Sequence, residues 1–329
     1  MRLPTSFRVA IGLMLGALAL TTHAAPSDTA SHYPASTVRI VVPYPPGGFN
    51  DTLGRVVANE LTKAWGKPVI VDNKPGAGTI LGTQAVARAP ADGLTVLVVQ
   101  FPFAANPWLY SKLPYDSIRD FTPVVLAGHS PMLLVVNAGS KLRSVNDLVT
   151  AARAAHGNLA YGSSGSGSSN HLAMALFARM AGVEMNQVPY KGSTPMLTDL
   201  AGGQVEVAFD ALPHALPFIQ SGKLRPIAIA DEKRSPLMPN LPTVAQSGVT
   251  GYEVSSWHGF MVRTGTPQAI IDKLNADINA ILRRPDIQQQ FATHGVQVDG
   301  GNQAQFQSFI AKQMALCKQV VADARIPPQ

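Results

Sequence analysis

The sequence predicts an α/β protein built from two lobes of similar design. Strand-like apolar runs alternate with helix-like periodic segments along most of the chain, an order typical of parallel sheets covered by helices. A strand, a glycine-rich loop and a helix follow one another near residue 45 and again near residue 165. The two units share no repeat of fixed period, so the pattern indicates two α/β lobes and not a solenoid.

The N-terminus has the pattern of a secretory signal peptide over residues 1–25. Arg2 and Arg8 flank the start of a short apolar stretch, and small residues follow it up to the expected cleavage point after Ala24 or Ala25. No later segment reaches the roughly 18 uninterrupted apolar residues of a membrane-spanning helix. No cysteine stands at the cleavage point, which argues against a lipoprotein anchor. We therefore expect a soluble, exported protein that acts as a monomer.

Composition argues against several classes of function. The formal charge is +6, and it falls by two to +4 when Arg2 and Arg8 leave with the signal peptide. Charged residues make up only 14% of the chain and form no basic cluster, so we expect no nucleic-acid partner. The only cysteine, Cys317, cannot form an intramolecular disulfide. The histidines and carboxylates lack metal-ligand spacing, and we expect no metal and no other cofactor.

The first lobe is predicted from five consecutive segments. Val38–Tyr44 is an apolar strand, and Asp51–Trp65 carries an apolar stripe at helical spacing. Lys67–Val71 is a second strand, Thr79–Arg88 a helix and Leu94–Gln100 a third strand. This β-α-β-α-β order predicts a parallel sheet with helices on both faces.

The second lobe restarts the same pattern, and a helical tail follows it. Strands are expected at Pro131–Val136, Asn158–Tyr161, Gln187–Tyr190, Val205–Phe209 and Leu224–Ala230, and helices at Val145–Ala155 and Thr194–Leu200. In the tail, Thr266 is expected to cap a helix that has Pro267 at its first position. Further tail helices are expected at Pro285–Thr293 and Gln303–Ala324, returning to cover the first lobe.

The chain is expected to cross between the lobes twice, near Thr122–Gly128 and near Tyr252–Met261. Lobe 1 would then comprise 26–124 and 252–329, and lobe 2 would comprise 125–251. Two crossings make a hinge and a cleft, and clefts of α/β proteins bind ligands beyond the carboxyl ends of the strands.

The loop "VPYPPGGFND" is the first candidate for ligand binding. Its three prolines end the strand, while Gly47 and Gly48 allow a sharp turn and close approach to the backbone. Asp51 lies in the first turn of the following helix. Such a loop can aim free backbone N–H groups at a ligand, although a tight βα turn without a ligand explains it equally well.

The serine- and glycine-rich loop Ser163–Asn170 is the second candidate. A strand precedes it and a helix follows, which favours an anion site at a helix N-terminus over a flexible linker. It lacks the Gly-Lys-Ser/Thr of a phosphate-binding loop and the third glycine of a dinucleotide fingerprint. The Gly-x-Ser-x-Gly elbow is also absent, so a serine hydrolase using His171 and Asp210 is only a remote alternative.

Three further residues have two interpretations each. Asp210 follows a predicted strand and would accept N–H groups from the loops or from a ligand, or would cap the helix over Pro213–Gln220. Tyr190 and Trp257 lie near predicted strand ends, where aromatic side chains more often pack in the core than touch a ligand.

The chain resembles a known receptor family over essentially all of its mature length. The motifs that carry the resemblance are, in order, "VPYPPGGFNDTLGR", "VDNKPGAGTILG", "PADGLTVLVV", "YGSSGSGSSNHLA", "VPYKGSTPMLTDLAGGQVEVAFD", "SGKLRPIAIA", "LPTVAQSG" and "SWHGFMVRTGTP". They resemble the periplasmic substrate-binding receptors of tripartite tricarboxylate transporters, often called Bug-type receptors. The resemblance implies a type II periplasmic binding fold whose lobes close about a hinge, each lobe a mainly parallel sheet flanked by helices.

The resemblance also implies the site residues. The family's Pro-Gly-Gly-x-x-Asp loop corresponds to Pro46, Gly47, Gly48 and Asp51, and its Tyr-Lys-Gly corner begins at Tyr190. The residues expected to bind the solute are Tyr44, Pro46, Gly47, Gly48, Asp51, Gln100, Phe101, Ser163, Ser164, Gly165, Ser168, Asn170, Tyr190 and Asp210. The pair Phe101 and Phe103 would favour an aromatic or apolar-bodied acid, unless it simply packs in the core.

The function implied is that of a receptor without enzymatic activity. It would capture a small carboxylate, such as a di- or tricarboxylate, an acidic amino acid or an aromatic acid, and deliver it to the membrane permease subunits of a tripartite tricarboxylate transporter. Two alternatives stay open: an exported sensor that presents its closed form to a membrane kinase, and the serine hydrolase.

Overall fold

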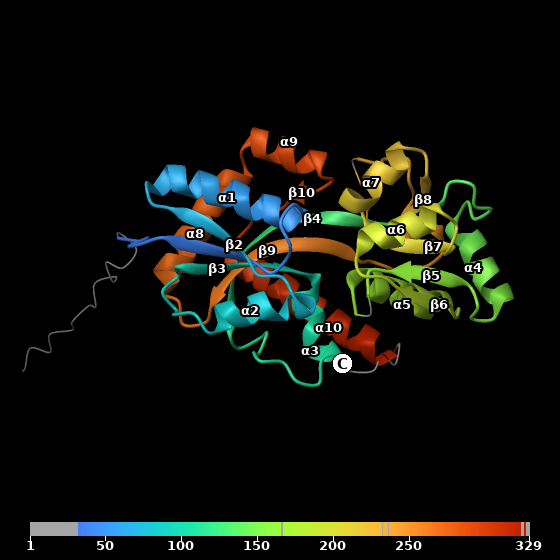
Figure 1. The fold of residues 1–329 in the computed structure, drawn as a ribbon, viewed down its shortest axis with the longest axis horizontal. Coiled ribbons are helices and arrows are strands. Elements are labelled where there is room, and N and C mark those ends of the chain that lie inside the picture. The colour runs from blue at the N-terminus through green and yellow to red at the C-terminus, as the bar shows by residue number, and fades with distance from the viewer. Residues whose placement is uncertain (1–31, 166, 232, 236, 324–325, 327–329) are drawn as a thin grey trace, which may run out of the picture.

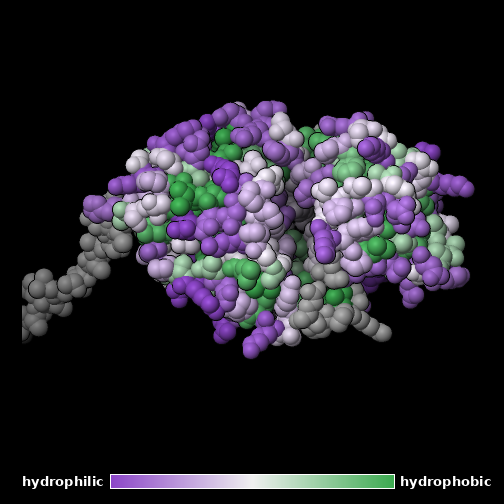
Figure 2. Space-filling view, in the orientation of Figure 1, coloured by the Kyte–Doolittle hydropathy of each residue, from purple (hydrophilic) through white to green (hydrophobic). Residues whose placement is uncertain are grey.

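The computed structural model describes residues 32–165, 167–231, 233–235, 237–323 and 326. The signal peptide expected over 1–25 lies outside them. The described chain forms two α/β lobes that lie side by side and are joined by long strands (Figure 1). In space-filling form, a furrow separates the two halves on the face shown (Figure 2). In the part of the chain described, no helix combines the length and apolarity that crossing a membrane needs.

Lobe 1 is built on a sheet with the strand order β2-β1-β3-β9-β4, and β10 pairs with β4. Its own strands are β1 (Val38–Val42), β2 (Val69–Asn73), β3 (Thr95–Gln100), β9 (Ser255–Arg263) and β10 (Gln297–Val298). Its helices are α1 (Phe49–Trp65), η2 (Ala77–Thr79), α2 (Ile80–Ala87), α3 (Phe101–Leu109), α8 (Gln268–Leu282), α9 (Pro285–Thr293) and α10 (Gln303–Asp323).

The apolar stripe predicted for α1 does form the buried face of that helix. Leu53, Val57 and Leu61 are buried against the sheet, in a core shared with β1 and α8. Each such side chain stabilises the fold by roughly 1.5–3 kcal/mol relative to an exposed one. The helix ends at Gly66, whose φ of 63° is the left-handed conformation of a helix C-terminus. Glycine is needed there because other residues adopt that conformation at a cost.

Lobe 2 has its own sheet, with the strand order β4-β7-β5-β6 and β8 on the other side of β4. Its strands are β5 (Ala160–Ser163), β6 (Asn186–Pro189), β7 (Val207–Ala211) and β8 (Leu224–Ile229). Its helices are α4 (Val145–Ala155), α5 (Ser169–Ala181), α6 (Ser193–Ala201), α7 (Leu212–Gln220) and η3 (Ala245–Ser247). Ser144 caps α4 and Ser168 caps α5, each by accepting a backbone N–H three residues on.

The long strand β4 (Phe121–Asn137) connects the two sheets. It pairs with β9 from Phe121 to Pro131 and with β7 from Met132 to Val136, so its partners change between Pro131 and Met132. The sequence predicted only Pro131–Val136, because Pro123 and Gly128 interrupt the apolar run. Irregular pairing at both positions accommodates these residues without ending the strand.

Both sheets are mixed, because the connecting strands run against the others. The pairs β1–β2, β1–β3, β5–β6 and β5–β7 are parallel, as the βαβ pattern predicts. The pairs that β4 and β9 form are antiparallel. The expectation of mainly parallel sheets therefore holds for the βαβ units, and the strands that link the lobes depart from it.

The lobe limits at 124/125 and 251/252 stay a proposal.

The C-terminal helix α10 joins both lobes on one side of the molecule. It contacts α3 and β4, and it also contacts α5 of lobe 2 (Figure 1). Gly259 on β9 allows this, since a Cβ there would lie 2.3 Å from the ring of Phe306 on α10. The Arg179–Asp323 ion pair, at 2.9 Å, links α5 to the end of α10. Cys317 is buried on this helix, and burial raises the pKa of its thiol to about 12.

One expected helix start is wrong. The helix α8 begins at Gln268 with Pro267 as its N-cap, and not at Pro267 with Thr266 as the cap. The hydroxyl of Thr266 donates to the backbone oxygen of Arg263 at 2.8 Å, so it stabilises the preceding turn.

Candidate functional site

A cavity of about 420 Å³ lies between the lobes and has walls from both. Its floor lies on the strands that link the lobes, with Ser130 from β4 and Ser256 and His258 from β9. The remaining wall residues are Tyr44, Pro45, Pro46, Gly48, Phe49, Asn50, Gln100, Pro102, Ser164, Ser168, Ser169, Asn170, Gly192, Ser193, Asp210, Ala211, Pro213 and His214.

Five helices begin at this cavity. The N-cap residues of α1, α3, α5, α6 and α7 all line it, and they are Gly48, Gln100, Ser168, Gly192 and Ala211. The first N–H groups of a helix have no partner within it, and the helix dipole places about half a positive charge there. None of the described wall residues is Lys or Arg. These helix termini make the cavity a candidate anion site.

Asp51 stabilises the first loop through hydrogen bonds, without lining the cavity itself. It is buried, and its Oδ2 accepts the backbone N–H of Gly47 and Nε of Arg55, both at 3.0 Å. Its Oδ1 accepts from Nδ2 of Asn73 at 2.9 Å. Burial alone would raise the pKa of Asp51, but the hydrogen bonds from Arg55, Gly47 and Asn73 outweigh it and hold the pKa below its usual value. Asp51 is not a wall residue, so it positions the loop.

The second loop is also held by its own hydrogen bonds. Oγ of Ser168 donates to the backbone oxygen of Gly165 at 2.7 Å and accepts the backbone N–H of His171 at 3.3 Å. Nδ2 of Asn170 donates to the backbone oxygen of Phe209 at 2.7 Å, and Oγ of Ser164 donates to Oδ1 of Asn170. Ser166 lies outside the described residues. These bonds fix the start of α5 at the cavity wall.

Asp210 lies at the N-termini of α6 and α7. Its Oδ1 accepts from Oγ of Ser193 at 3.1 Å, from the backbone N–H of Ala211 at 2.7 Å and from Nδ1 of His214 at 3.1 Å. Oδ2 has no partner among the described protein atoms. The N-cap of α7 is Ala211, so Asp210 does not cap it. Because a protein carboxylate already faces α6 and α7, the termini of α1, α3 and α5 remain for an external anion. Pro102 in the first turn of α3 removes one of its backbone N–H groups, so α1 and α5 offer the fuller sets of donors.

His214 lies at the rim of the cavity, beside Asp210. Its side chain is half exposed and pairs with Asp210. Burial lowers the pKa of His214, but the hydrogen bond and the negative charge of Asp210 outweigh burial and raise the pKa above its ordinary value. The raised pKa favours the protonated imidazole beside Asp210.

The floor is polar but uncharged. His258 Nδ1 donates to Oδ1 of Asn50 at 2.8 Å, and Nε2 of Gln100 donates to Oγ of Ser256 at 2.9 Å. Burial, followed by the charges of His214 and His129, lowers the pKa of His258 to about 3. The imidazole is therefore neutral at physiological pH.

Among the predicted site residues, the structure places eight on the cavity wall. These are Tyr44, Pro46, Gly48, Gln100, Ser164, Ser168, Asn170 and Asp210. Gly165 lines an adjoining cavity. Gly47 does not line the solute cavity, and its backbone N–H donates to Asp51. Three others lie away from the wall: Ser163 is buried and accepts from Gln187, Phe101 is buried in the core, and Tyr190 packs against the lobe 2 core.

The comparison with known families identifies the group to which this protein belongs. The family model described as "Tripartite tricarboxylate transporter family receptor", TctC, matches residues 53–325. The chain belongs to this receptor family.

Relatives and solved structures agree with this assignment. Protein BugT of Bordetella pertussis is 36% identical over 303 residues, which cover 92% of this chain and 93% of BugT. The R. palustris protein Rpa4515, solved with adipate, is 37% identical with a TM-score of 0.81, covering 90% of this chain and all of that one. The periplasmic binding protein BugD is 31% identical with a TM-score of 0.77, again covering 90% of this chain and all of that one.

The receptor does not have the geometry of a serine hydrolase at His171. Its Nδ1 accepts the backbone N–H of Gly167 at 2.9 Å, and burial lowers the pKa of His171 to about 4. With Nδ1 occupied as an acceptor, a neutral imidazole carries its proton on Nε2 and cannot take one from a serine there.

In the described part of the chain, no group of three or more His, Cys, Asp or Glu side chains could hold a metal ion.

The list of expected site residues missed seven polar residues of the wall. They are Asn50, Ser130, Ser169, Ser193, His214, Ser256 and His258. Asn50 and His214 follow helix starts, a signal that was available. Ser130, Ser256 and His258 lie within strands that link the lobes, and only the pairing of β4 with β9 brings them to one floor.

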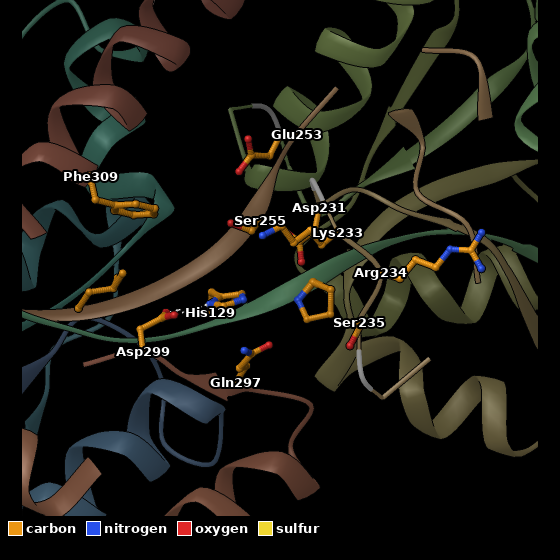
Figure 3. Close-up of a pocket in the computed structure, with 12 residues that line it drawn as sticks. His129, Asp231, Lys233, Arg234, Ser235, Glu253, Ser255, Gln297, Asp299 and Phe309 are labelled. Carbon is orange, nitrogen blue, oxygen red and sulfur yellow. Dashed lines mark hydrogen bonds and ion pairs between the residues drawn. The ribbon is translucent and has the colours of Figure 1, made fainter. Parts of the chain in front are cut away.

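A cavity of about 490 Å³ lies on the opposite face of β4 and β9 (Figure 3). Successive residues of a strand point to opposite faces, so His129 and Ser255 line this cavity while Ser130 and Ser256 line the other. His129 Nδ1 lies 2.8 Å from Oδ2 of Asp299. Burial raises the pKa of Asp231 to about 6, with the positive His129 lowering it and nearby carboxylates raising it. Lacking helix N-caps among its described residues, this cavity is not the candidate anion site.

Proposed function

We propose that this protein is a periplasmic solute receptor that closes its two lobes around a small carboxylate. It would deliver the solute to the membrane permease subunits of a tripartite tricarboxylate transporter. The family of receptors supports the transport role, and the relative solved with adipate supports a carboxylate solute.

One observation carries the proposal: the N-termini of α1 and α5, from opposite lobes, meet at one cavity. A carboxylate placed between Gly48 and Ser168 would accept backbone N–H groups from both lobes at once. Asp210 already lies at the start of α6 and α7, and Pro102 removes a backbone N–H from the start of α3, which favours the termini of α1 and α5 as the anion site.

The same arrangement explains why a solute would close the cleft. A ligand shifts an open–closed equilibrium only by its difference in affinity for the two forms. A carboxylate bound to one lobe engages one helix terminus, while the closed form supplies both. The second terminus is therefore the source of that difference.

The variant Gly48→Val tests the location of the anion site. Gly48 has a φ of −84°, which valine adopts freely, and a Cβ there would meet no atom within 4 Å. The added methyl groups would lie over the start of α1 without straining the fold. Gly202→Val, at the far end of α6 with a φ of −81°, is the matched control.

The assay is a thermal-shift screen over mono-, di- and tricarboxylates, followed by calorimetry with the acids that raise the melting temperature. We expect Gly48→Val to weaken binding at least tenfold while its ligand-free melting temperature stays that of Gly202→Val. Equal affinity in the two variants would place the anion elsewhere. If no carboxylate raises the wild-type melting temperature, the solute class is wrong. Uptake in a deletion strain separates delivery to a permease from sensing.

A further inference from the structure

A side chamber of about 360 Å³ adjoins the solute cavity. The two cavities share wall residues from both loops and from α3, namely Tyr44, Pro45, Pro102, Ser164 and Ser168. The side chamber therefore begins where the α1 and α5 loops face each other. A solute held between those loops has its remaining atoms at the entrance to this chamber.

The chamber has largely apolar walls. Besides the shared residues, they are formed by Pro43, Pro75, Gly76, Gly78, Thr79, Asn106, Leu109, Tyr110, Gly165 and Gly167. None of the described lining residues is charged. The solute cavity, by contrast, contains Asp210 and His214. The two cavities thus differ in chemistry although they share a wall.

Most polar side chains of the chamber are already bonded within its wall. Nδ2 of Asn106 donates to the backbone oxygen of Gly78 at 2.9 Å, and it lies 3.5 Å from Oγ1 of Thr79. Oγ of Ser168 donates to Gly165, and Oγ of Ser164 donates to Asn170. These groups therefore favour an apolar occupant over a second charged group of the solute.

The chamber does not depend on the phenylalanines that the sequence singled out. Phe101 and Phe103 are each only 2% exposed and pack in the core. The residue between them, Pro102, is the one that lines both cavities.

We propose that the side chamber binds the apolar body of the solute, so that the receptor selects a monocarboxylate carrying a short alkyl chain or an aryl ring. This inference rests on the proposed function, because the carboxylate must lie between the α1 and α5 termini for its body to enter the chamber. A second carboxylate on the solute would be placed among prolines, Leu109 and Tyr110, away from any described cation of the wall. Thr79, the N-cap of α2, also lines the chamber, but the backbone N–H of Ile80 at the start of that helix already donates to Ala77.

The test is calorimetry with a series of straight-chain monocarboxylates from propanoate to hexanoate, together with benzoate, succinate and adipate. Burying one methylene is worth about 0.8 kcal/mol, which corresponds to a three- to fourfold tighter Kd per added carbon. We expect this gradient in the wild type, with hexanoate and benzoate binding more tightly than succinate and adipate.

Pro75→Trp checks that the gradient comes from the chamber. Pro75 lies exposed at its rim, so a tryptophan there narrows the chamber without disturbing the core. Pro114→Trp, exposed and outside both cavities, is the control. We expect Pro75→Trp to flatten the gradient while propanoate binds as before, and Pro114→Trp to keep it. Tyr110→Ala, which enlarges the chamber, should move the optimum to a longer chain.

The outcomes separate this inference from the function on which it rests. A flat wild-type gradient, a preference for succinate or adipate, or an unchanged gradient in both Pro75→Trp and Tyr110→Ala overturns the side-chamber proposal while carboxylate binding stands. Failure of every acid to bind overturns the proposed function itself.

Discussion

Replacing Asp231 by asparagine should stabilise the protein at neutral pH. Asp231 follows β8 and lines the cavity behind the strands that link the lobes, with Lys233 and Arg234 beside it (Figure 3). Burial, more than the repulsion from Glu253 and Asp299, raises its pKa to about 6, although His129 opposes the rise. The folded protein therefore binds this proton more tightly than the unfolded chain does.

The sign and size follow from linkage. A carboxyl whose pKa rises on folding destabilises the fold once it ionises, so stability falls as pH rises from about 4 to about 6. The rise from 3.8 to about 6 corresponds to at most about 3 kcal/mol at 1.36 kcal/mol per pKa unit. Because Asp231 is partly exposed, water offsets part of this cost. We therefore expect Asp231→Asn to gain about 1–2 kcal/mol at pH 8 and at most about 0.5 kcal/mol at pH 4.

Urea unfolding between pH 4 and pH 8 measures this difference. Asp272→Asn, an exposed position on α8, serves as the control for removing one carboxyl. The hydrogen bond with Asp299 raises the pKa of His129, whose stabilisation is lost as pH rises through that pKa. The charge of Asp231 adds to the rise of the His129 pKa, so this pH-dependent loss is smaller in the variant than in the wild type. A variant that is less stable than wild type at pH 8, or a gain of equal size at pH 4, would refute the reasoning.

Three further changes have defined outcomes. Asp51→Asn should weaken carboxylate binding about tenfold by calorimetry, because the loop loses charge-assisted bonds; binding unchanged would show that the loop holds itself. Arg225→Ala should lower the free energy of unfolding by about 2–4 kcal/mol in urea, since it donates to three backbone carbonyls after β4; a loss below 1 kcal/mol would contradict this. Gly82→Ala should lower it by about 1–3 kcal/mol, because its Cβ would lie 2.7 Å from Cβ of Pro43 and 2.9 Å from the backbone oxygen of Lys74; an unchanged melting temperature would show that the loop yields.

The βαβ units were predictable from the chain because their signals are local. The apolar stripe of α1 and the glycine after it specify that helix and its end within 18 residues. The helix α9 was predicted with the bounds it has, since Pro285 marks its first turn. Long β4 was predicted only in its second half, because its first half carries proline and glycine that irregular pairing tolerates.

The candidate site, like the fold, was predictable from the sequence only in part. The two glycine-rich loops were found from the sequence, since a strand, such a loop and a helix start leave backbone N–H groups free. Which loop side chains face the cavity was not predictable. Asp51 and Phe101 share their loops with wall residues and yet point into the protein, because packing behind each loop sets the direction of its side chains.

By itself, the amino-acid sequence determined the two-lobed α/β plan, the receptor family and the two loops at the start of α1 and α5. Each of these depends on residues that are neighbours along the chain. Only the tertiary structure decided that five helices begin at one cavity, that Asp210 occupies two of them, and that Ser130, Ser256 and His258 form its floor. These groups come from distant segments, and only the pairing of β4 with β9 and the packing of the two lobes bring them to the wall of one cavity.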